Sequence, residues 1–296
     1  MYAIGGRGAA GVLQSCEKFD PKVGYWSPDV PDLPPLPGKS PGRWFLAVVE
    51  VNGFLWAIGG SNGLGSQSVV SIYDGGPKWT NIPPLPEERV YHGAGAIVNP
   101  LVPNDWVVVV GGKVGPGNGP GWTNRTTVFD QSEFRWAQGA DLNVPRQLPA
   151  IGVVGLKLFA VGGFNGDAGV LDSAEVYDVA QDTWRVLGTL PKGVVASAVG
   201  AVVGAGGAPL LLSTGGLETY VPLGDPVAAV SESSDGGAAW AKAPPMAQAR
   251  TYHGVAVVGN GTAAGGPRRL FAVGGSRLGD ASNATGALAS VEVFVV

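Results

Sequence analysis

Residues 158–184 read LFAVGGFNGDAGVLDSAEVYDVAQDTW, and this stretch is the most informative about the fold. An apolar run ends in the glycine pair Gly162–Gly163, a second run ends in Tyr177–Asp178 after a loop, and Trp184 closes the segment. Branched and aromatic residues favour half-buried strand positions, and glycine permits backbone bends that other residues resist. The stretch therefore predicts two strands joined by a loop, with large aromatic side chains available to pack against a neighbouring layer.

The same pattern recurs along the whole chain of 296 residues. The glycine pairs stand at 5–6, 59–60, 111–112, 162–163, 215–216 and 274–275, with steps of 54, 52, 51, 53 and 59 residues. In five copies a tryptophan follows in phase: Trp26, Trp79, Trp136, Trp184 and Trp240. A period near 50 residues is typical of one four-stranded propeller blade, and such blades must stack to bury their faces. We therefore expect an all-β fold, with residues 1–296 forming one six-bladed β-propeller domain.

The sequence departs from the pattern in two ways. The fifth copy reads VSESSDGGAAW (230–240) in place of the Tyr-Asp strand, which resembles an Asp-box turn built on Ser233, Asp235 and Gly237. The first copy begins at its glycine strand and the last ends at SVEVFVV, so each end copy is expected to have three strands instead of four. Either the chain is shortened or a partner covers the incomplete seam, because open strand edges promote aggregation.

Composition limits the classes of function. The net charge of −4 disfavours a nucleic-acid binder, and one cysteine, Cys16, allows no internal disulfide. The uncharged stretch 193–217 has the length of a membrane span, but its glycines and Pro209 predict a strand hairpin there. The start MYAIGG has no basic and apolar leader, so we expect a cytoplasmic protein. The glycosylation sequons at Asn124, Asn260 and Asn283 are interpreted as chance matches.

The order of Gly-Gly, Tyr-Asp and Trp resembles the signature of the kelch-repeat β-propeller family. Residues 158–184 are most similar to the kelch domains of BTB–kelch ubiquitin-ligase adaptors. That resemblance implies a protein-binding adaptor or scaffold that grips a partner's peptide at one loop-rich mouth of the central channel. It implies no cofactor.

Two repeat positions would line that mouth: the basic residue that enters each blade and the residue directly after Gly-Gly. Together with nearby aromatic residues, these positions give the candidate binding residues Arg7, Arg43, Arg89, Tyr91, Lys113, Arg146, Phe164, Lys192, Arg250 and Tyr252. Arginine pairs carboxylates in a bidentate manner, so the predicted ligand is an acidic peptide segment of another protein. The alternative is that the arginines hold loops by bonding backbone carbonyls.

Catalysis is not expected. The two histidines, His92 and His253, occupy matching repeat positions on blades that would lie on opposite sides of a six-bladed ring, and shared ligands must each lie about 2 Å from a metal. We predict no catalytic residue, metal, nucleic-acid partner or membrane insertion. An enzyme or sugar-binding protein that uses the central channel is the alternative, and a structural subunit that docks through its seam blades is another. The proline clusters 30–37 and 82–89 are interpreted as turns instead of SH3 ligands.

Overall fold

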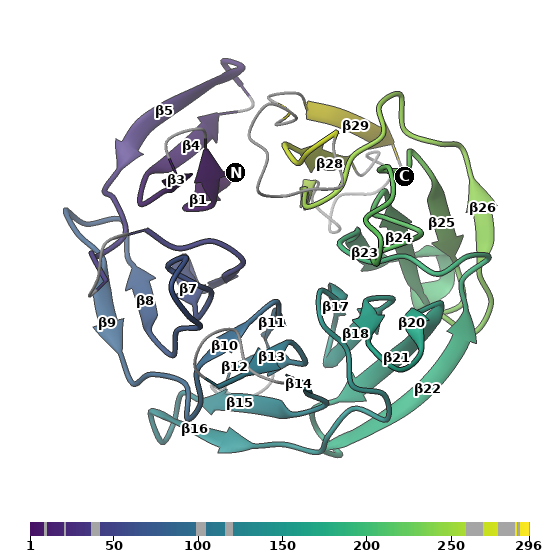
Figure 1. Cartoon of the computed structure of the whole chain (residues 1–296), viewed down its shortest axis with the longest axis horizontal. Coiled ribbons are helices and arrows are strands. Elements are labelled where there is room, and N and C mark those ends of the chain that lie inside the picture. The colour runs from purple at the N-terminus through teal and green to yellow at the C-terminus, as the bar shows by residue number, and fades with distance from the viewer. Residues whose placement is uncertain are drawn as a thin grey trace. The chain divides into compact units, whose positions relative to one another are not determined.

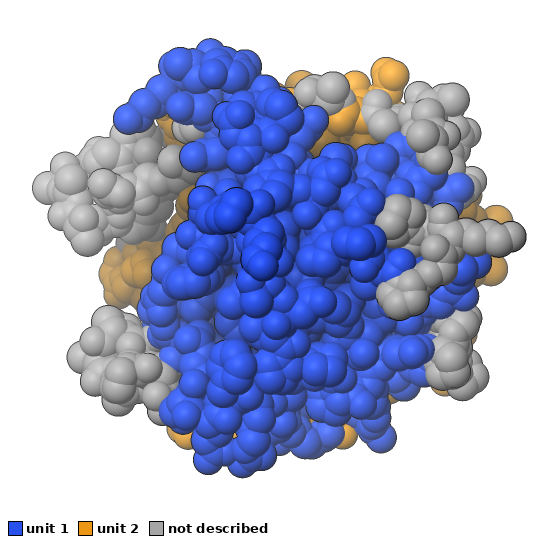
Figure 2. Space-filling view, turned by 90° about the vertical axis from the view of Figure 1, so that its left-hand side faces the viewer, with its two compact units in different colours: residues 1–139 blue, residues 140–296 orange. Residues whose placement is uncertain are grey.

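The computed structural model describes residues 1–8, 11–20, 22–36, 42–98, 105–115, 121–258, 269–277, 288 and 291–295. Their secondary structure is almost entirely strand, apart from the short 3-10 helix η2 (Ala205–Gly207). The chain divides into two compact units, residues 1–139 and 140–296 (Figure 2). The all-β prediction is confirmed, while closure of six blades into one ring stays a prediction.

Three of the antiparallel sheets in unit 1 are called blades 1 to 3 in chain order (Figure 1). Blade 1 consists of β1 (Tyr2–Ile4), β4 (Cys16–Asp20) and β5 (Tyr25–Val30). Blade 2 consists of β6 (Ala47–Val51), β7 (Phe54–Ile58), β8 (Val70–Tyr73) and β9 (Thr80–Ile82). Blade 3 consists of β11 (Gly93–Ile97), β12 (Trp106–Val110), β15 (Thr126–Asp130) and β16 (Arg135–Gln138). Short ribbons extend from the glycine pairs: β2 (Arg7–Gly8) with β3 (Gly11–Val12), and β10 (Arg89–Val90) with β13 (Lys113–Val114) and β14 (Gly121–Trp122).

Unit 2 repeats this plan in blades 4 to 6. Blade 4 consists of β17 (Ala150–Val154), β18 (Lys157–Val161), β21 (Ser173–Asp178) and β22 (Thr183–Thr189), with the ribbon β19 (Phe164–Asn165) and β20 (Gly169–Val170). Blade 5 consists of β23 (Ala198–Val203), β24 (Pro209–Thr214), β25 (Val230–Ser233) and β26 (Ala241–Ala243). Blade 6 consists of β27 (Gly254–Val258), β28 (Arg269–Val273) and β29 (Val291–Val295).

These sheets match the strand pattern expected from the repeats. Within the described residues, blades 1 and 6 have three strands and blades 2 to 5 have four. The uncharged stretch 193–217 contains the hairpin β23–β24, in which Ala198 pairs with Thr214. In the part of the chain that the structure describes, no helix has the length and apolar character needed to cross a membrane.

Each glycine pair adopts backbone angles that suit glycine. Gly162 has a φ of +62°, and a Cβ there would lie 2.3 Å from the carbonyl oxygen of Val194 in the next blade. Gly163 donates its N–H to the same oxygen at 2.8 Å. A side chain at Gly162 would push the two blades apart, so the recurring glycines are explained by close approach between neighbouring strands.

Three of the repeat tryptophans bond the segment that leads into their own blade. The indole Nε1 of Trp79 donates to the carbonyl oxygen of Pro31 at 2.8 Å, and that of Trp136 donates to Pro83 at 2.9 Å. In unit 2, Trp184 donates to Ala140 at 3.0 Å. Two of the acceptors lie in the proline clusters, which therefore have the structural role that the sequence favours.

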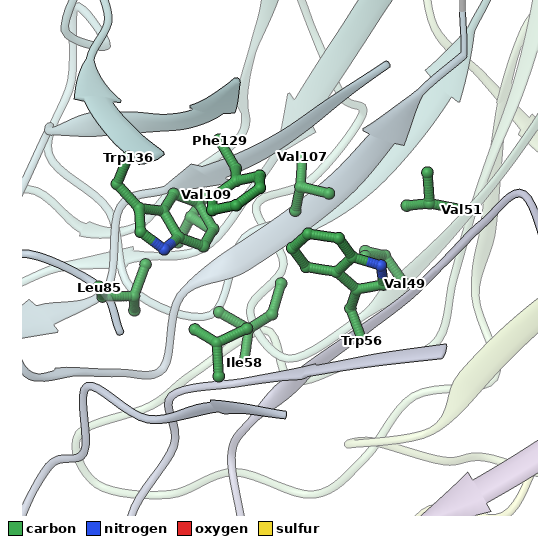
Figure 3. Packing of buried hydrophobic residues seen from close by; sticks show 10 residues of the cluster. Val49, Val51, Trp56, Ile58, Leu85, Val107, Val109, Phe129 and Trp136 are labelled. Atoms are coloured by element: carbon green, nitrogen blue, oxygen red, sulfur yellow. The ribbon is translucent and has the colours of Figure 1, made fainter. Parts of the chain in front are cut away.

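Aromatic rings fill the apolar layer between blades 2 and 3. Phe129 lies between two tryptophans, with its ring centroid 5.1 Å from that of Trp56 and 5.0 Å from that of Trp136 (Figure 3). The buried side chains of Val107, Val109 and Ile58 belong to the same cluster. Such edge-on aromatic contacts add stability beyond the area they bury.

The fifth copy forms the Asp-box turn that its sequence resembles. The hydroxyl of Ser233 donates to the Asp235 carboxylate at 2.7 Å and accepts the N–H of Gly237 at 2.8 Å. Asp235 also accepts the N–H of Ala239 at 3.0 Å. The Nε1 of Trp240 has no hydrogen-bond partner among the described residues. Blade 5 instead contacts blade 4 through the backbone, where Gly188 donates its N–H to the carbonyl of Gly237 at 2.9 Å.

A candidate protein-binding surface

Four of the predicted binding arginines lie inside the blades. Arg43, Arg146 and Arg250 are 0% exposed and Arg89 is 2% exposed. Each guanidinium reaches across its own blade to a side chain on the third strand of the sheet. The acceptors are Ser71, Thr127, Glu175 and Glu292.

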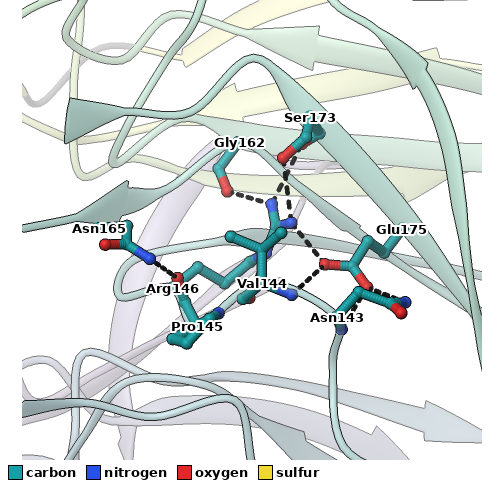
Figure 4. Close-up of polar contacts among 8 residues, drawn as sticks. All are labelled: Asn143, Val144, Pro145, Arg146, Gly162, Asn165, Ser173 and Glu175. Atoms are coloured by element: carbon teal, nitrogen blue, oxygen red, sulfur yellow. Dashed lines mark hydrogen bonds and ion pairs between the residues drawn. The ribbon is translucent and has the colours of Figure 1, made fainter. Parts of the chain in front are cut away.

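Arg146 has the fullest set of these contacts. Its Nη1 donates to the carbonyl oxygens of Gly162 at 2.7 Å and Ser173 at 3.1 Å, and its Nη2 lies 2.7 Å from Oε1 of Glu175 (Figure 4). The other carboxylate oxygen of Glu175 accepts two N–H groups of Asn143 at 2.8 Å. The arginine therefore fixes the loop that enters blade 4, which is the alternative role considered for this repeat position.

Lys192 does not occupy the repeat position of the arginines. In blades 2, 3, 4 and 6 the second residue after the arginine has a positive φ: Phe45, Tyr91, Leu148 and Tyr252. In blade 5 the residue with this conformation is Ala196, at φ +54°. The position equivalent to the arginines is therefore Val194, and the alignment of Lys192 with them is wrong. Lys192 is exposed and its Nζ lies 2.8 Å from Oε2 of Glu218.

The remaining unit 1 candidates come together at its surface. The guanidinium of Arg7 lies over the ring of Trp44, with Cζ 4.8 Å from the ring centroid. Trp44 and Phe45 have ring centroids 4.5 Å apart, as do Phe45 and Tyr91. Arg7 is exposed and the three rings are partly exposed. We call Arg7, Trp44, Phe45 and Tyr91 the aromatic cluster.

Backbone conformation orients two of these rings. Phe45 has a φ of +50° and Tyr91 a φ of +59°. Residues other than glycine rarely adopt positive φ values. Because residues strained in this way persist only when the surroundings hold them, the rings are presented by a rigid framework. Burial raises the pKa of the Tyr91 hydroxyl, so the phenol is neutral and can donate a hydrogen bond.

A second cation lies on the ribbon that adjoins this cluster. Lys113 on β13 pairs with Val90, the residue before Tyr91, and its Nζ lies 4.8 Å from the centroid of Trp122. Desolvation lowers the pKa of Lys113. Unit 1 thus presents two cations beside aromatic rings, a combination that suits carboxylates flanked by apolar side chains.

Two unit 2 candidates, Phe164 and Lys192, contact the loop between β24 and β25. Phe164 is 8% exposed and its ring centroid lies 4.9 Å from that of Tyr220. Tyr252 is partly buried and donates its N–H to the Ala196 carbonyl at 3.0 Å.

Four aromatic residues of these contacts, Trp44, Phe45, Trp122 and Tyr220, were not among the sequence candidates. Phe45 could have been found, because RWF (43–45), RVY (89–91) and RTY (250–252) share an aromatic residue two places after arginine.

The histidines are interior residues. The Nε2 of His253 lies 2.9 Å from Oγ1 of Thr214. Burial and the charge of Arg89 lower the pKa of His92 from 6.5 to about 3, and burial and Arg250 lower that of His253 to about 3. Among the described residues, His, Cys, Asp and Glu do not gather in groups of three that could hold a metal ion.

Cys16 and the sequons can also be placed. Cys16 is 2% exposed, and burial raises the pKa of its thiol to about 11. The side chain is therefore a neutral thiol in the interior of the blade. Asn124 is partly exposed, but Thr126 of the same sequon is 0% exposed in β15. Asn260 and Asn283 lie outside the described residues.

Comparison with known proteins finds a family match for the repeat in blade 4. A family model described as the Kelch motif matches residues 145–191, which contain Arg146, the glycine pair of blade 4, Tyr177 and Trp184. This match supports a kelch-repeat family for the chain. The chain is 27% identical to beta-scruin of Limulus polyphemus over 204 residues, which is 64% of this chain and 21% of scruin.

Two further relatives carry the kelch name. The chain is 29% identical to Kelch-like protein 40 of Mus musculus over 164 residues, 54% of this chain and 24% of that protein. It is 33% identical to Kelch-like protein 15 of Homo sapiens over 89 residues, 30% of this chain and 15% of that protein. The matches therefore span a quarter or less of the length of these relatives.

Proposed function

We propose that this kelch-repeat chain is a protein-binding module that takes an acidic segment of a partner on the aromatic cluster of unit 1. The observation that carries the proposal is the continuous contact from Arg7 through Trp44 and Phe45 to Tyr91 at a partly exposed surface. Tryptophan, tyrosine and arginine are the residues that most often dominate binding energy at protein interfaces.

The two cations at this surface favour a negatively charged ligand. The chain has a net charge of −4, yet the aromatic cluster contains Arg7 and adjoins Lys113. A carboxylate that replaces the solvent around Arg7 gains a charge-assisted hydrogen bond, and an apolar neighbour can cover the rings. The four buried arginines and the unit 2 candidates are not proposed as contacts. This leaves Arg7, Tyr91 and Lys113, together with Trp44 and Phe45, as the proposed binding residues.

A peptide array tests the proposal. The array carries 15-residue peptides, each with an aromatic or aliphatic centre and acidic, neutral or basic flanks. We expect the intact chain to retain acidic peptides and the double variant Phe45→Asn, Tyr91→Asn to lose them. Asparagine tolerates positive φ better than most residues, so the variant removes the rings with little backbone strain.

The matched control is Leu148→Asn, which makes the same kind of change at the equivalent position of blade 4, where φ is +51°. Circular dichroism must show that both variants are folded. Retention of the same peptides by the double variant would overturn the assignment of this surface. Preference for basic peptides would overturn the acidic ligand.

A further inference from the structure

A loop of unit 2 presents apolar side chains to solvent. Residues 217–226 connect β24 to β25, and at their tip Val221 is 77% exposed and Leu223 is 47% exposed, with the exposed Pro222 between them. Single exposed apolar residues are common, whereas neighbouring ones form a continuous apolar surface that a partner could cover.

The loop is closed and supported at its base. Leu217 pairs with both Val195 and Pro226, and Gly224 donates its N–H to the carbonyl of Thr219 at 3.2 Å. A Cβ at Gly224 would lie 2.1 Å from Oγ1 of Thr219, so the two sides of the loop are in close contact. The Tyr220 ring packs on Phe164, and Glu218 pairs with Lys192. A tip held in this way loses little conformational entropy when it docks.

The chemistry of the tip matches the ligand proposed for unit 1. Val221, Pro222 and Leu223 lie between Glu218, which pairs with Lys192, and the exposed Asp225, so the loop is itself an apolar segment with an exposed acidic end. The aromatic cluster offers the complement, since it combines Arg7 with partly exposed rings and adjoins Lys113. The exposed Asp225 disfavours an anionic lipid surface as the occupant of this tip.

We infer that the loop 217–226 of one copy of this chain docks on the aromatic cluster of a second copy. This inference rests on the proposed function, because it uses the same surface and the same ligand chemistry. Self-association then competes with a foreign acidic segment for the cluster, so occupancy by a partner depends on the concentration of the chain.

Sedimentation equilibrium of the purified chain across a wide concentration range tests the inference. We expect reversible association of the intact chain. The loop variant Val221→Ser, Leu223→Ser and the cluster variant Phe45→Asn, Tyr91→Asn should each weaken association by more than about tenfold, as loss of a central contact does. The control Val203→Ser, at a residue that is 46% exposed in the same unit, should associate like the intact chain.

Complementation makes the test specific to this contact. The loop variant keeps an intact cluster and the cluster variant keeps an intact loop, so an equimolar mixture should associate although neither variant does so alone. A monomeric intact chain, an associating loop variant or a mixture that stays monomeric would each overturn the inference. Co-sedimentation with phosphatidylcholine vesicles that only the loop variant loses would overturn it by assigning the tip to a lipid surface.

The experiments distinguish a failure of the self-association inference from a failure of the proposed peptide-binding surface. A monomeric chain that still binds acidic peptides through Phe45 and Tyr91 would reject self-association alone. An associating chain whose cluster variant retains both association and peptide binding would reject the proposed surface as well.

Discussion

Arg146 and Glu175 form a fully buried ion pair in blade 4, with Nη2 and Oε1 2.7 Å apart and both side chains 0% exposed. The same guanidinium bonds the backbone at Gly162, and the same carboxylate bonds the backbone at Asn143. The pair therefore fixes the entry loop of the blade to its second and third strands. In blade 2 the equivalent Arg43 has the hydroxyl of Ser71 in place of a carboxylate, and burial lowers its pKa to about 10.

Glu175→Gln is expected to destabilise the chain by about 3 kcal/mol, because it leaves a buried guanidinium without its counter-ion. The measurement is the free energy of unfolding in urea. Glu292→Gln is the matched control, since Glu292 bonds Arg250 but its side chain is 17% exposed, and its loss should be smaller. Equal losses for the two variants would contradict the role given to burial.

Stability should fall in mild acid because of His92 and His253. Their pKa values are about 3 in the folded chain and 6.5 as the ordinary value, so the unfolded chain binds more protons between these limits. The stabilisation is therefore present above pH 6.5 and is lost as the pH falls toward 3, by about 2 kcal/mol for each histidine between pH 7 and pH 5.

Urea unfolding at pH 7 and pH 5 measures this loss in the intact chain and in His92→Gln. The variant should lose about half as much stability over that interval as the intact chain. An identical pH dependence in the two chains would mean that His92 is not held neutral by burial.

Gly188→Ala should open the contact between blades 4 and 5. A Cβ at Gly188 would lie 2.1 Å from the carbonyl oxygen of Ala238, so the backbone bond from Gly188 to Gly237 would be displaced. We expect a loss of about 2 kcal/mol in thermal or urea unfolding. Gly254→Ala serves as the control in the same unit, because a Cβ there meets no atom within 4 Å. A neutral Gly188→Ala would show that this backbone contact does not hold the blades.

The strands could be predicted from the sequence because their pattern is local. Each apolar run that ends in Gly-Gly forms the second strand of its sheet or, in blade 1, the first described one, and the hairpin at 198–214 follows from glycine and proline alone. Trp79, Trp136 and Trp184 also follow their phase in the sequence, since each bonds a backbone carbonyl in the segment that leads into its own blade.

The role of the arginines could not be predicted in the same way. A guanidinium beside proline at the start of a strand looks like a surface cation, and only the three-dimensional blade brings carbonyl oxygens and Glu175 around Arg146. The sequence alignment of blade 5 was also wrong because it looked for a basic residue and chose Lys192. Val194, two residues later, occupies the arginine position. The contact between Arg7 and Trp44 joins residues from two blades, which no local pattern reveals.

Calorimetric titration with one acidic peptide measures whether the aromatic cluster of unit 1 binds carboxylates. The peptide selected on the array is compared with its counterpart in which Asp and Glu are replaced by Asn and Gln, against the intact chain, Arg7→Glu and the control Lys157→Glu, a charge reversal at an exposed residue of unit 2. We expect Arg7→Glu to weaken binding of the acidic peptide more than about tenfold, Lys157→Glu to leave it unchanged, and the neutral peptide to be insensitive to both substitutions. Equal affinity of the acidic peptide for all three chains would show that Arg7 does not bind it.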